Sequence, residues 1–514
     1  MAVSVSALPH VDDTNIGVGG MGGDPVGLNE LLRMCVGHGE QCQQGKHEES
    51  LAHEPAVSPY SGSVNDTTLS GVSVLVAGAG LAGLAAARDL IALGATVTVI
   101  DVRDRVGGRV WTIRDGFAEG QHAEAGGDFI DEEQHEIRNL AGELGLELAR
   151  IIRGGFGYVR PDQSGRPKIV ARNARRGWER LSRELHAVGR PYTLAERRWD
   201  SPIAGDIARR STAGWLDQIK ADAELRETAT GLRGFFLADP DELSLIALVD
   251  QFADSDAPAP GAMYRVKGGN DRLTAALAAP LGDRLHLNTD VVALSHRGKV
   301  VRVSVKNNRA LAQINCDYAI LALPATLLRR MPITPALPAQ QHEAIVRLKY
   351  GRATRTLLQF SKRFWRAAGR PRAFGSPLPF GAVYDGNEDQ RGRAGILSLL
   401  AGGGASDATQ AIVAKHGARG LTDALDWLGS KDGELLTSRQ IVWEQDPYAR
   451  GGYAYFDPGF DPSLRAWLSR PAGRLFFAGE HTSVKWQGYM NGAVESGRRA
   501  AAEVAAVHRA PPTT

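Results

Sequence analysis

The 514-residue sequence predicts an α/β protein, in which a Rossmann-type domain is assembled from separated segments around an inserted α+β domain. A strand, a glycine-rich turn, a helix and a second strand are expected in succession over residues 72–100. Further strands are expected at 285–294, 300–305 and 318–323, and a small-residue helix at 493–507. The segments 150–255 and 350–440 mix charged, helix-like stretches with strands. This alternation is typical of one domain that interrupts another.

The overall composition is that of an ordinary globular protein, with 43% hydrophobic and 23% charged residues. Sixty Lys and Arg stand against 58 Asp and Glu, and this near balance gives no reason to expect nucleic acid or an anionic membrane as partner. We expect no membrane span and no export signal. Three cysteines are too few for a disulfide framework, so a cytoplasmic location is expected.

Residues 1–70 differ from the rest of the chain. They are rich in Gly, Ser, His and acidic residues and show little periodicity. We therefore expect a largely disordered extension, with an amphipathic patch at 28–34 as a candidate docking helix. Two cysteines and two histidines lie close together there, at Cys35, His38, Cys42 and His47. Their spacing matches no standard zinc pattern, so no metal site is predicted.

The segment GAGLAG, residues 78–83, stands between the first strand and the first helix. Gly78 permits the tight turn, Gly80 lets the backbone approach a pyrophosphate, and Gly83 allows the helix to pack closely on the strand. The helix N-terminus then offers N–H groups and a partial positive charge to the phosphates. Asp101 ends the second strand, where a carboxylate can bind ribose hydroxyls and disfavours the 2′-phosphate of NADP. This pattern predicts a dinucleotide site.

Four further motifs narrow the class of dinucleotide enzyme. They are RVGGR at 105–109, EAGGD at 124–128, LFFAGEH at 475–481 and WQGYMNGAVESG at 486–497. Together with the glycine turn they resemble the flavin-containing amine oxidase family, which includes monoamine oxidases, polyamine oxidases and L-amino-acid oxidases. The resemblance runs from about residue 72 to about residue 500 and does not cover the first 70 residues.

The resemblance implies that the cofactor is FAD and not NAD. The FAD would be held by a Rossmann-type FAD-binding domain of the GR2-like kind. This discontinuous domain would comprise residues 71–150, 260–345 and 441–508. The substrate-binding domain would comprise residues 151–259 and 346–440.

The resemblance also implies roles for individual residues. Arg109 and its glycines would lie along the pyrophosphate and flavin, and Glu480 would bind the ribityl or phosphate part. The backbone N–H of Met490 would face the flavin N1/O2 edge and stabilise negative charge there. The backbone of Val291 would contact the adenine. The full predicted cofactor set is Gly78, Gly80, Gly83, Asp101, Arg103, Gly108, Arg109, Gly126, Gly127, Asp128, Val291, Gly479, Glu480, Tyr489 and Met490.

Flavin chemistry on an amine needs a neutral substrate whose α-C–H faces flavin N5, in a site that excludes water. An apolar pocket with aromatic walls meets these needs, because desolvation lowers the pKa of an ammonium group. The resemblance implies Tyr453 and Tyr489 as the pair that encloses the amine, with Trp486 in the same wall. Gly452 stands where relatives with covalent flavin have a cysteine, so non-covalent FAD is expected.

Arg355 departs from the family pattern. The family usually has a lysine at this place, which holds a water against flavin N5 and assists the reaction with oxygen; the nearest lysine here is Lys349. A guanidinium cannot release its proton as an amine does. Arg355 is therefore a predicted catalytic residue, and the electron acceptor is expected to be oxygen or another acceptor.

The predicted reaction is oxidation of a primary or secondary amine by hydride transfer to flavin N5, giving an imine, then an aldehyde or ketone, and hydrogen peroxide. L-amino-acid oxidases place an arginine for the substrate carboxylate after the loop that residues 124–128 resemble. Phe129 and Ile130 follow here, which favours a plain amine, although Arg160 could substitute. A flavin-dependent desaturase or dehydrogenase with another acceptor, and a flavoprotein scaffold with little turnover, stay open, as does a homodimer.

Overall fold

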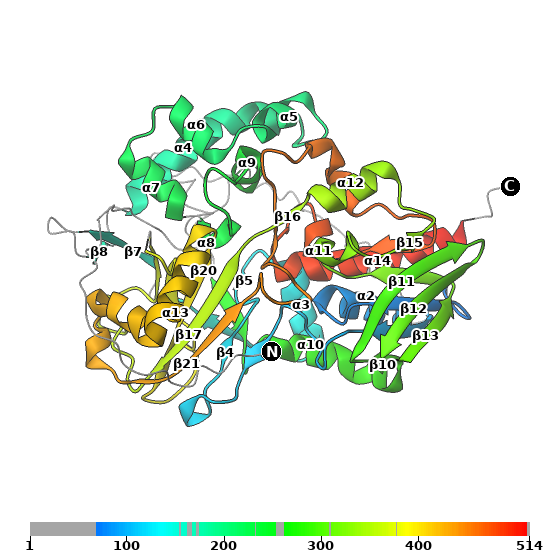
Figure 1. The fold of residues 1–514 in the computed structure, drawn as a ribbon, viewed down its shortest axis with the longest axis horizontal. Helices are drawn as coiled ribbons and strands as arrows, with labels where there is room; N and C mark the ends of the chain where they lie inside the picture. Colours follow the sequence, from blue (N-terminus) through cyan, green and yellow to red (C-terminus); the bar gives the residue numbers. More distant parts are fainter. Residues whose placement is uncertain are drawn as a thin grey trace, which may run out of the picture.

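The computed structural model describes residues 68–510, apart from 154–155, 162–166, 171–173, 232, 253–261, 308–309 and 377 (Figure 1). The predicted N-terminal extension lies outside the described residues except for its last three, of which Leu69 is buried. The candidate docking helix at 28–34 and the cysteines and histidines at 35–47 also lie outside them.

A parallel sheet of five strands forms the centre of the first domain, in the order β10-β2-β1-β14-β23. Its strands are β1 (Ser73–Ala77), β2 (Thr96–Ile100), β10 (Leu285–His286), β14 (Tyr318–Leu321) and β23 (Leu475–Phe477). Short runs of β-branched, aliphatic and aromatic residues form these strands because a parallel sheet is covered on both faces. The predicted α/β class is confirmed, and distant segments do meet in one sheet.

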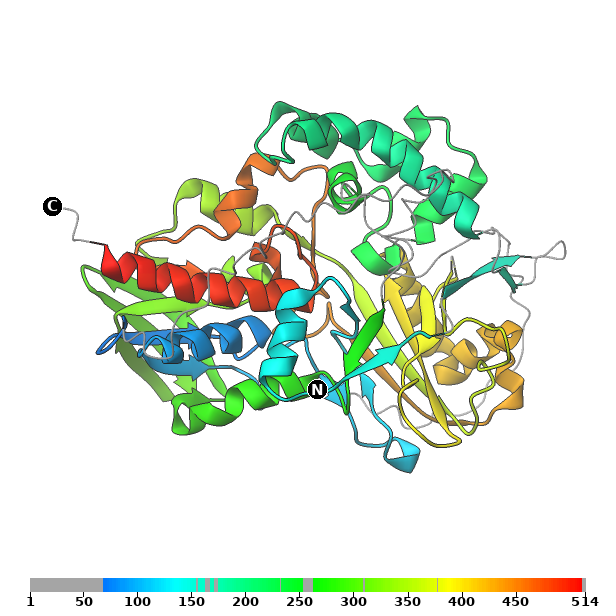
Figure 2. The same cartoon turned by 180° about the vertical axis from the view of Figure 1, so that it is seen from behind.

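Helices α2 (Leu81–Ala92) and α14 (Met490–Arg509) pack side by side in this domain, as the blue and red helices of Figure 2 show. Their close approach needs small residues. A Cβ at Gly497 of α14 would lie 2.2 Å from the carbonyl oxygen of Ala82 in α2. Helices α3 (His135–Glu143) and α10 (Asp271–Ala278) complete this layer, in which the N-terminal half of α14 lies beside the start of α2.

A second, four-stranded sheet has the order β13-β12-β11-β15. It contains β11 (Thr289–Arg297), β12 (Val300–Asn307), β13 (Ala310–Cys316) and β15 (Ile333–Thr334). The single strand predicted at 285–294 is wrong, because β10 pairs parallel with β2 while β11 pairs antiparallel with β12. The chain turns between them at Asn288, whose φ of +53° belongs to the left-handed region.

The inserted domain is built on a mixed seven-stranded sheet in the order β21-β17-β20-β19-β18-β7-β8. The strands are β7 (Phe156–Pro161), β8 (Pro167–Val170), β17 (Ala353–Phe360), β18 (Ala373–Gly375), β19 (Ala382–Asp385), β20 (Gly395–Gly402) and β21 (Leu435–Val442). Helix α13 (Gly404–Ala424) packs on this sheet. Strand β17 is buried along its whole length, so its side chains face neighbours on both sides.

A layer of helices gathers along one side of the molecule, at the top of Figure 1. It contains α4 (Ala174–Leu194), α5 (Pro202–Ala208), α6 (Thr212–Gln218), α7 (Ala223–Gly231), α8 (Arg233–Phe236) and α9 (Leu245–Phe252). The remaining helices and strands are short: β3 (Thr112–Ile113), β4 (Ala123–Glu124), β5 (Ile130–Asp131), β6 (Leu148–Ile151), β9 (Met263–Val266), α11 (Ala325–Leu328), α12 (Ala339–Arg347), β16 (Lys349–Tyr350) and β22 (Ala454–Tyr455).

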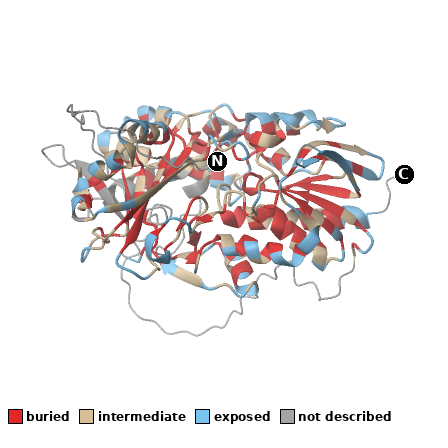
Figure 3. Ribbon diagram, turned by 60° about the horizontal axis from the view of Figure 1, so that its bottom comes forward, coloured by how far each residue is buried: buried red, intermediate tan, exposed pale blue. Residues whose placement is uncertain are grey.

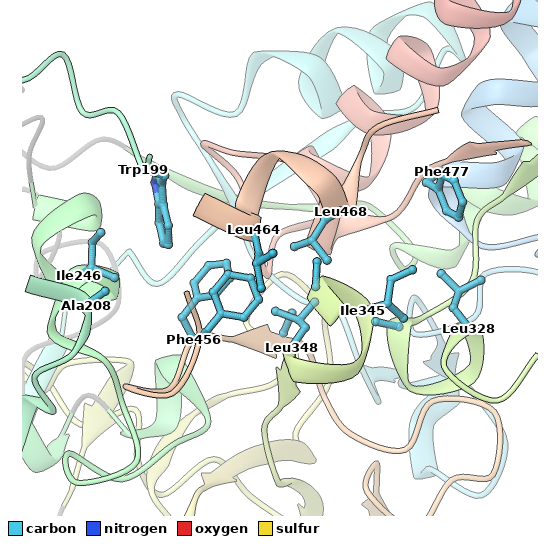
Figure 4. Close-up of a cluster of buried hydrophobic side chains, with 14 of the residues drawn as sticks. Trp199, Ala208, Ile246, Leu328, Ile345, Leu348, Phe456, Leu464, Leu468 and Phe477 are labelled. Atoms are coloured by element: carbon cyan, nitrogen blue, oxygen red, sulfur yellow. The ribbon is translucent and has the colours of Figure 1, made fainter. Parts of the chain in front are cut away.

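The core is continuous across the junction of the two domains. Buried residues run through both sheets and the helices that cover them (Figure 3). In one cluster, Trp199 and Ile246 from the helical layer join Phe456 and Leu464, and the cluster continues to Phe477 of β23 (Figure 4). A site between the domains is therefore bounded on both sides by closely packed, buried residues. None of the helices in the described part of the chain is long and apolar enough to cross a membrane.

Candidate active site

A cavity of about 640 Å³ extends from the glycine turn to the junction of the domains, a size typical of small-molecule sites. Every predicted cofactor residue except Gly83 lines it: Gly78, Gly80, Asp101, Arg103, Gly108, Arg109, Gly126, Gly127, Asp128, Val291, Gly479, Glu480, Tyr489 and Met490. Of the predicted catalytic residues, Arg355, Tyr453 and Tyr489 line it and Trp486 does not.

The turn between β1 and α2 is shaped by its glycines. Gly78 has a φ of +106°, and a Cβ there would lie 2.6 Å from the carbonyl oxygen of Ala322. A Cβ at Gly83 would lie 1.9 Å from the carbonyl oxygen of Gly78, so Gly83 packs inside the turn and does not reach the cavity. Gly80, by contrast, has open space in front of it. The N-terminus of α2 is therefore free to face a phosphate group.

Asp101 holds this turn as well as lining the cavity. One carboxylate oxygen accepts a hydrogen bond from the N–H of Ala79 (2.8 Å) and the other accepts one from the N–H of Arg103 (2.9 Å). The side chain of Arg103 pairs with both oxygens of Asp446, at 3.0 and 2.6 Å. Asp446 was not predicted, because it lies outside the family motifs and far from them in sequence. The pair connects the nucleotide turn to the segment that leads to Tyr453.

The Arg109–Glu480 ion pair (3.0 Å) joins two motifs that are far apart in the sequence. Arg109 also donates to the carbonyl oxygen of Gly452 (2.6 Å), and Glu480 accepts from the N–H of Gly488 (2.9 Å). Each of these glycines directly precedes one of the predicted tyrosines. The pair therefore positions both tyrosine segments in addition to facing the cavity.

The aromatic end of the cavity contains Tyr453, Tyr489 and Trp443. Burial raises the pKa of the Tyr453 hydroxyl above its ordinary value, so the ring stays neutral. Gly488 brings the two tyrosine segments together, since a Cβ there would lie 3.1 Å from the Tyr453 ring. Trp443, whose indole donates to the carbonyl oxygen of Ala125 (3.0 Å), was missed because a single tryptophan outside a motif carries no signal.

Trp486 is not among the residues that line the cavity, and its role in the substrate wall stays a prediction. Its ring packs edge-to-face with that of Tyr489, at 5.8 Å and 86°, so it supports that tyrosine. Gly492 allows this, because a Cβ there would lie 2.1 Å from the Trp486 carbonyl oxygen. Helix α14 can thus begin directly beneath the tyrosine, and Met490, its first residue, presents the helix N-terminus to the cavity.

Arg355 lies in β17 and is 4% exposed. Its guanidinium donates to Asp128 (3.2 Å), to the Ser398 hydroxyl (2.8 Å) and to the carbonyl oxygen of Gly126 (3.1 Å). Burial lowers the pKa of Arg355, and the Asp128 charge opposes that effect. The Asp128 carboxylate also accepts a hydrogen bond from Arg265 (2.8 Å). The side chain of this predicted cofactor residue is therefore paired with two arginines.

These features fit a flavin dinucleotide. The turn and helix α2 can hold a pyrophosphate, and the start of α14 offers N–H groups and positive charge to the flavin edge. A Cβ at Gly127 would lie 2.9 Å from the sulfur of Met490, so the glycine packs directly against the first residue of that helix.

The chain belongs to the flavin containing amine oxidoreductase family, whose sequence profile matches residues 81–505. It is therefore an FAD-dependent oxidoreductase that acts on amines.

Individual relatives agree with this assignment. The flavin-containing amine oxidase A of Sus scrofa is 27% identical over 457 residues, which cover 84% of this chain and 85% of that protein. The AofH protein of Mycobacterium tuberculosis is 30% identical over 463 residues, which cover 85% of this chain and 97% of that protein. Putrescine oxidase bound to putrescine and cyclohexylamine oxidase from Brevibacterium oxydans each match with a TM-score of 0.74 and 25% identity, covering 85% of this chain and 99% of theirs.

Proposed function

We propose that the chain oxidises a primary or secondary amine at the aromatic end of the cavity, with non-covalent FAD as hydride acceptor and oxygen as final acceptor. The products would be an imine, which water converts to an aldehyde or ketone, and hydrogen peroxide. One observation carries the proposal: a single cavity joins the glycine turn to Tyr453 and Tyr489.

The residues of the chain have separate tasks in this reaction. FAD, when bound, supplies the ring nitrogen that takes a hydride from the amine α-carbon. Gly78, Gly80 and the start of α2 would hold its pyrophosphate, and Met490 would support its electron-rich edge. Tyr453 and Tyr489 would orient the amine, and their half-buried, aromatic setting favours the neutral amine over the ammonium form.

A plain amine fits the cavity better than an α-amino acid does. Recognition of a substrate carboxylate requires a guanidinium with free donors. Both terminal nitrogens of Arg355 are engaged by Asp128, Ser398 and Gly126, which leaves only the buried Nε as a nitrogen without a partner. The side chain of Arg160, the other candidate, lies outside the described residues.

Non-covalent binding is supported at Gly452. A Cβ there would lie 2.4 Å from Leu237 and 2.8 Å from Ala353, so a cysteine side chain has no room. Acid precipitation of the purified protein should release the yellow colour into the supernatant. Flavin that stays with the precipitate would contradict non-covalent binding.

Anaerobic stopped-flow mixing with a panel of amines tests the reaction itself. We expect the oxidised flavin to bleach with at least one primary or secondary amine, and air to restore it with formation of peroxide. Flavin that stays oxidised with every amine would refute the proposal. Tyr453→Phe and Tyr489→Phe should each slow bleaching, whereas a desaturase acting on a carbon skeleton would not need these tyrosines.

We further propose the domain boundaries given above, a cytoplasmic location and the possibility of a homodimer. The single cysteine in the described residues, Cys316, is a buried free thiol, which agrees with a reducing compartment. Light scattering after size-exclusion chromatography would measure the oligomeric state.

A further inference from the structure

Four side chains form one hydrogen-bonded network at the cavity wall, Asp128, Arg265, Arg355 and Tyr384, of which Asp128 and Arg355 line the cavity. Nε of Arg265 donates to Oδ1 of Asp128 at 2.8 Å, and Nη1 of Arg355 donates to Oδ2 at 3.2 Å. The Tyr384 hydroxyl donates to the same Oδ2 at 2.7 Å. The carboxylate thus lies between two guanidinium groups.

Different elements contribute these side chains. Arg355 comes from β17, Arg265 from β9 and Tyr384 from β19, while Asp128 follows β4 in the EAGGD motif. The charged side chains of Asp128, Arg265 and Arg355 are 3%, 1% and 5% exposed. Charges this deeply buried are tolerated only where they are paired and hydrogen-bonded. The network therefore has little freedom to rearrange.

The Arg355 charge acts on the cavity as well as on the network. Arg355 lines the cavity, and its charge lowers the pKa of the Tyr453 hydroxyl against the stronger effect of burial. Its other terminal nitrogen donates to the carbonyl oxygen of Gly126, and the next residue, Gly127, packs against Met490. The cation therefore contacts the glycine segment directly, and its charge reaches Tyr453.

We propose that Asp128 is a positioning residue that fixes the Arg355 guanidinium as a permanent cation beside the flavin. The inference rests on the proposed function. A hydride carries two electrons and one proton to a neutral flavin and leaves it with one negative charge. A guanidinium offsets that charge without exchanging a proton, because it stays protonated in proteins. In a site of low dielectric constant, such a charge acts strongly over several ångströms.

Sulfite measures this effect without amine turnover. The sulfite anion adds to N5 of oxidised flavin and bleaches its absorbance, so its dissociation constant reports positive charge beside the ring. Arg355→Gln should weaken sulfite binding by about tenfold, the equivalent of about 1.4 kcal/mol. Asp128→Asn should weaken it by about fivefold, because the two guanidinium groups then repel each other across a neutral amide and Arg355 moves away.

The double variant decides whether Asp128 acts through Arg355. In the Arg355→Gln background, Asp128→Asn should change sulfite affinity by less than about twofold, since the group that it positions is gone. An equal effect in both backgrounds, or tighter binding in Asp128→Asn alone, would overturn the proposal. Thr356→Val, at a buried neighbour on β17 that does not line the cavity, is the matched control and should leave sulfite affinity unchanged.

Two milder variants keep the test decisive if Asp128→Asn does not fold. Tyr384→Phe removes one hydrogen bond from Asp128 and leaves both ion pairs; it should weaken sulfite binding by about twofold, and only when Arg355 is present. Arg355→Lys should bind sulfite well near neutral pH and lose affinity as pH rises through the lysine pKa, relative to the wild type. An Arg355→Lys profile parallel to the wild type would contradict the permanent-cation role.

Flavin content separates the two levels of inference. Wild-type protein that binds no FAD would refute the proposed function. Protein that binds FAD, bleaches with an amine, and shows the same sulfite affinity in every variant would refute the positioning role alone.

Discussion

Glu124 makes the stability of this protein depend on pH in an unusual direction. It is 1% exposed, and burial, reinforced by the neighbouring Asp128 charge, raises the pKa of its carboxyl from 4.5 to about 8. Its two oxygens accept hydrogen bonds from the Asn270 N–H and the Thr112 hydroxyl, both at 2.9 Å. The folded protein therefore keeps Glu124 protonated at neutral pH, whereas the unfolded chain ionises it.

The sign of the effect follows from proton binding. Between pH 4.5 and about 8 the folded state binds a proton that the unfolded state has lost, so the free energy of unfolding falls as pH rises. Each tenfold change in the proton equilibrium is worth about 1.4 kcal/mol, so the interval amounts to about 5 kcal/mol at most. The loss is complete above pH 8, where both states are ionised.

Glu124→Gln isolates this contribution. The amide oxygen can accept from the Asn270 N–H, the amide NH2 can donate to the Thr112 hydroxyl oxygen, and the side chain never ionises, so we expect the variant to match the wild type near pH 5. At pH 9 it should unfold at a temperature several degrees higher. Melting curves at pH 5, 6, 7, 8 and 9 on both proteins, with flavin content recorded, test the difference. Parallel curves across this range would refute the reasoning, because both proteins share all other titrating groups.

Three further substitutions test the site and the fold. Gly452→Cys should lower FAD content and form no covalent flavin, because its Cβ would lie 2.4 Å from Leu237; acid precipitation measures both. Glu480→Gln should lower FAD affinity by about tenfold and slow amine oxidation, because it breaks the pair with Arg109, and flavin release by titration measures the change. Gly497→Ala should destabilise the protein by about 1–3 kcal/mol in urea, because α14 must move away from α2. A stable Gly497→Ala variant would show that the helices separate at little cost.

The sequence predicted most of the nucleotide domain because its strands and first helix show clear periodicity and its glycines are required by close contacts. The turn at 78–83 could be assigned from spacing, and the structure places Gly78 and Gly83 in contacts where no Cβ fits. The strand expected at 285–294 could not be divided correctly, since alternation continues through Asn288 while the backbone reverses its pairing there. Sequence periodicity records which residues are buried and does not record which strand they face.

The cavity was harder to predict where its contacts join distant segments. Asp446 and Trp443 lie outside the motifs, and each is assigned only by its partner, Arg103 or the carbonyl of Ala125. Trp486 belongs to a strong motif, and its ring contacts Tyr489 while the residue does not line the cavity. A motif identifies a segment and not the direction in which each side chain points.

Charge balance explains why Arg355 can occupy its position at all. A buried guanidinium requires a carboxylate, and Asp128 supplies it. Arg265 brings a second positive charge to Asp128 and contacts Asp389 at 3.5 Å, so two arginines meet two carboxylates. An ionised Glu124 would add an uncompensated negative charge, which agrees with its raised pKa. The arginine at position 355 is therefore coupled to residues on three other segments, and these charges balance only as a set.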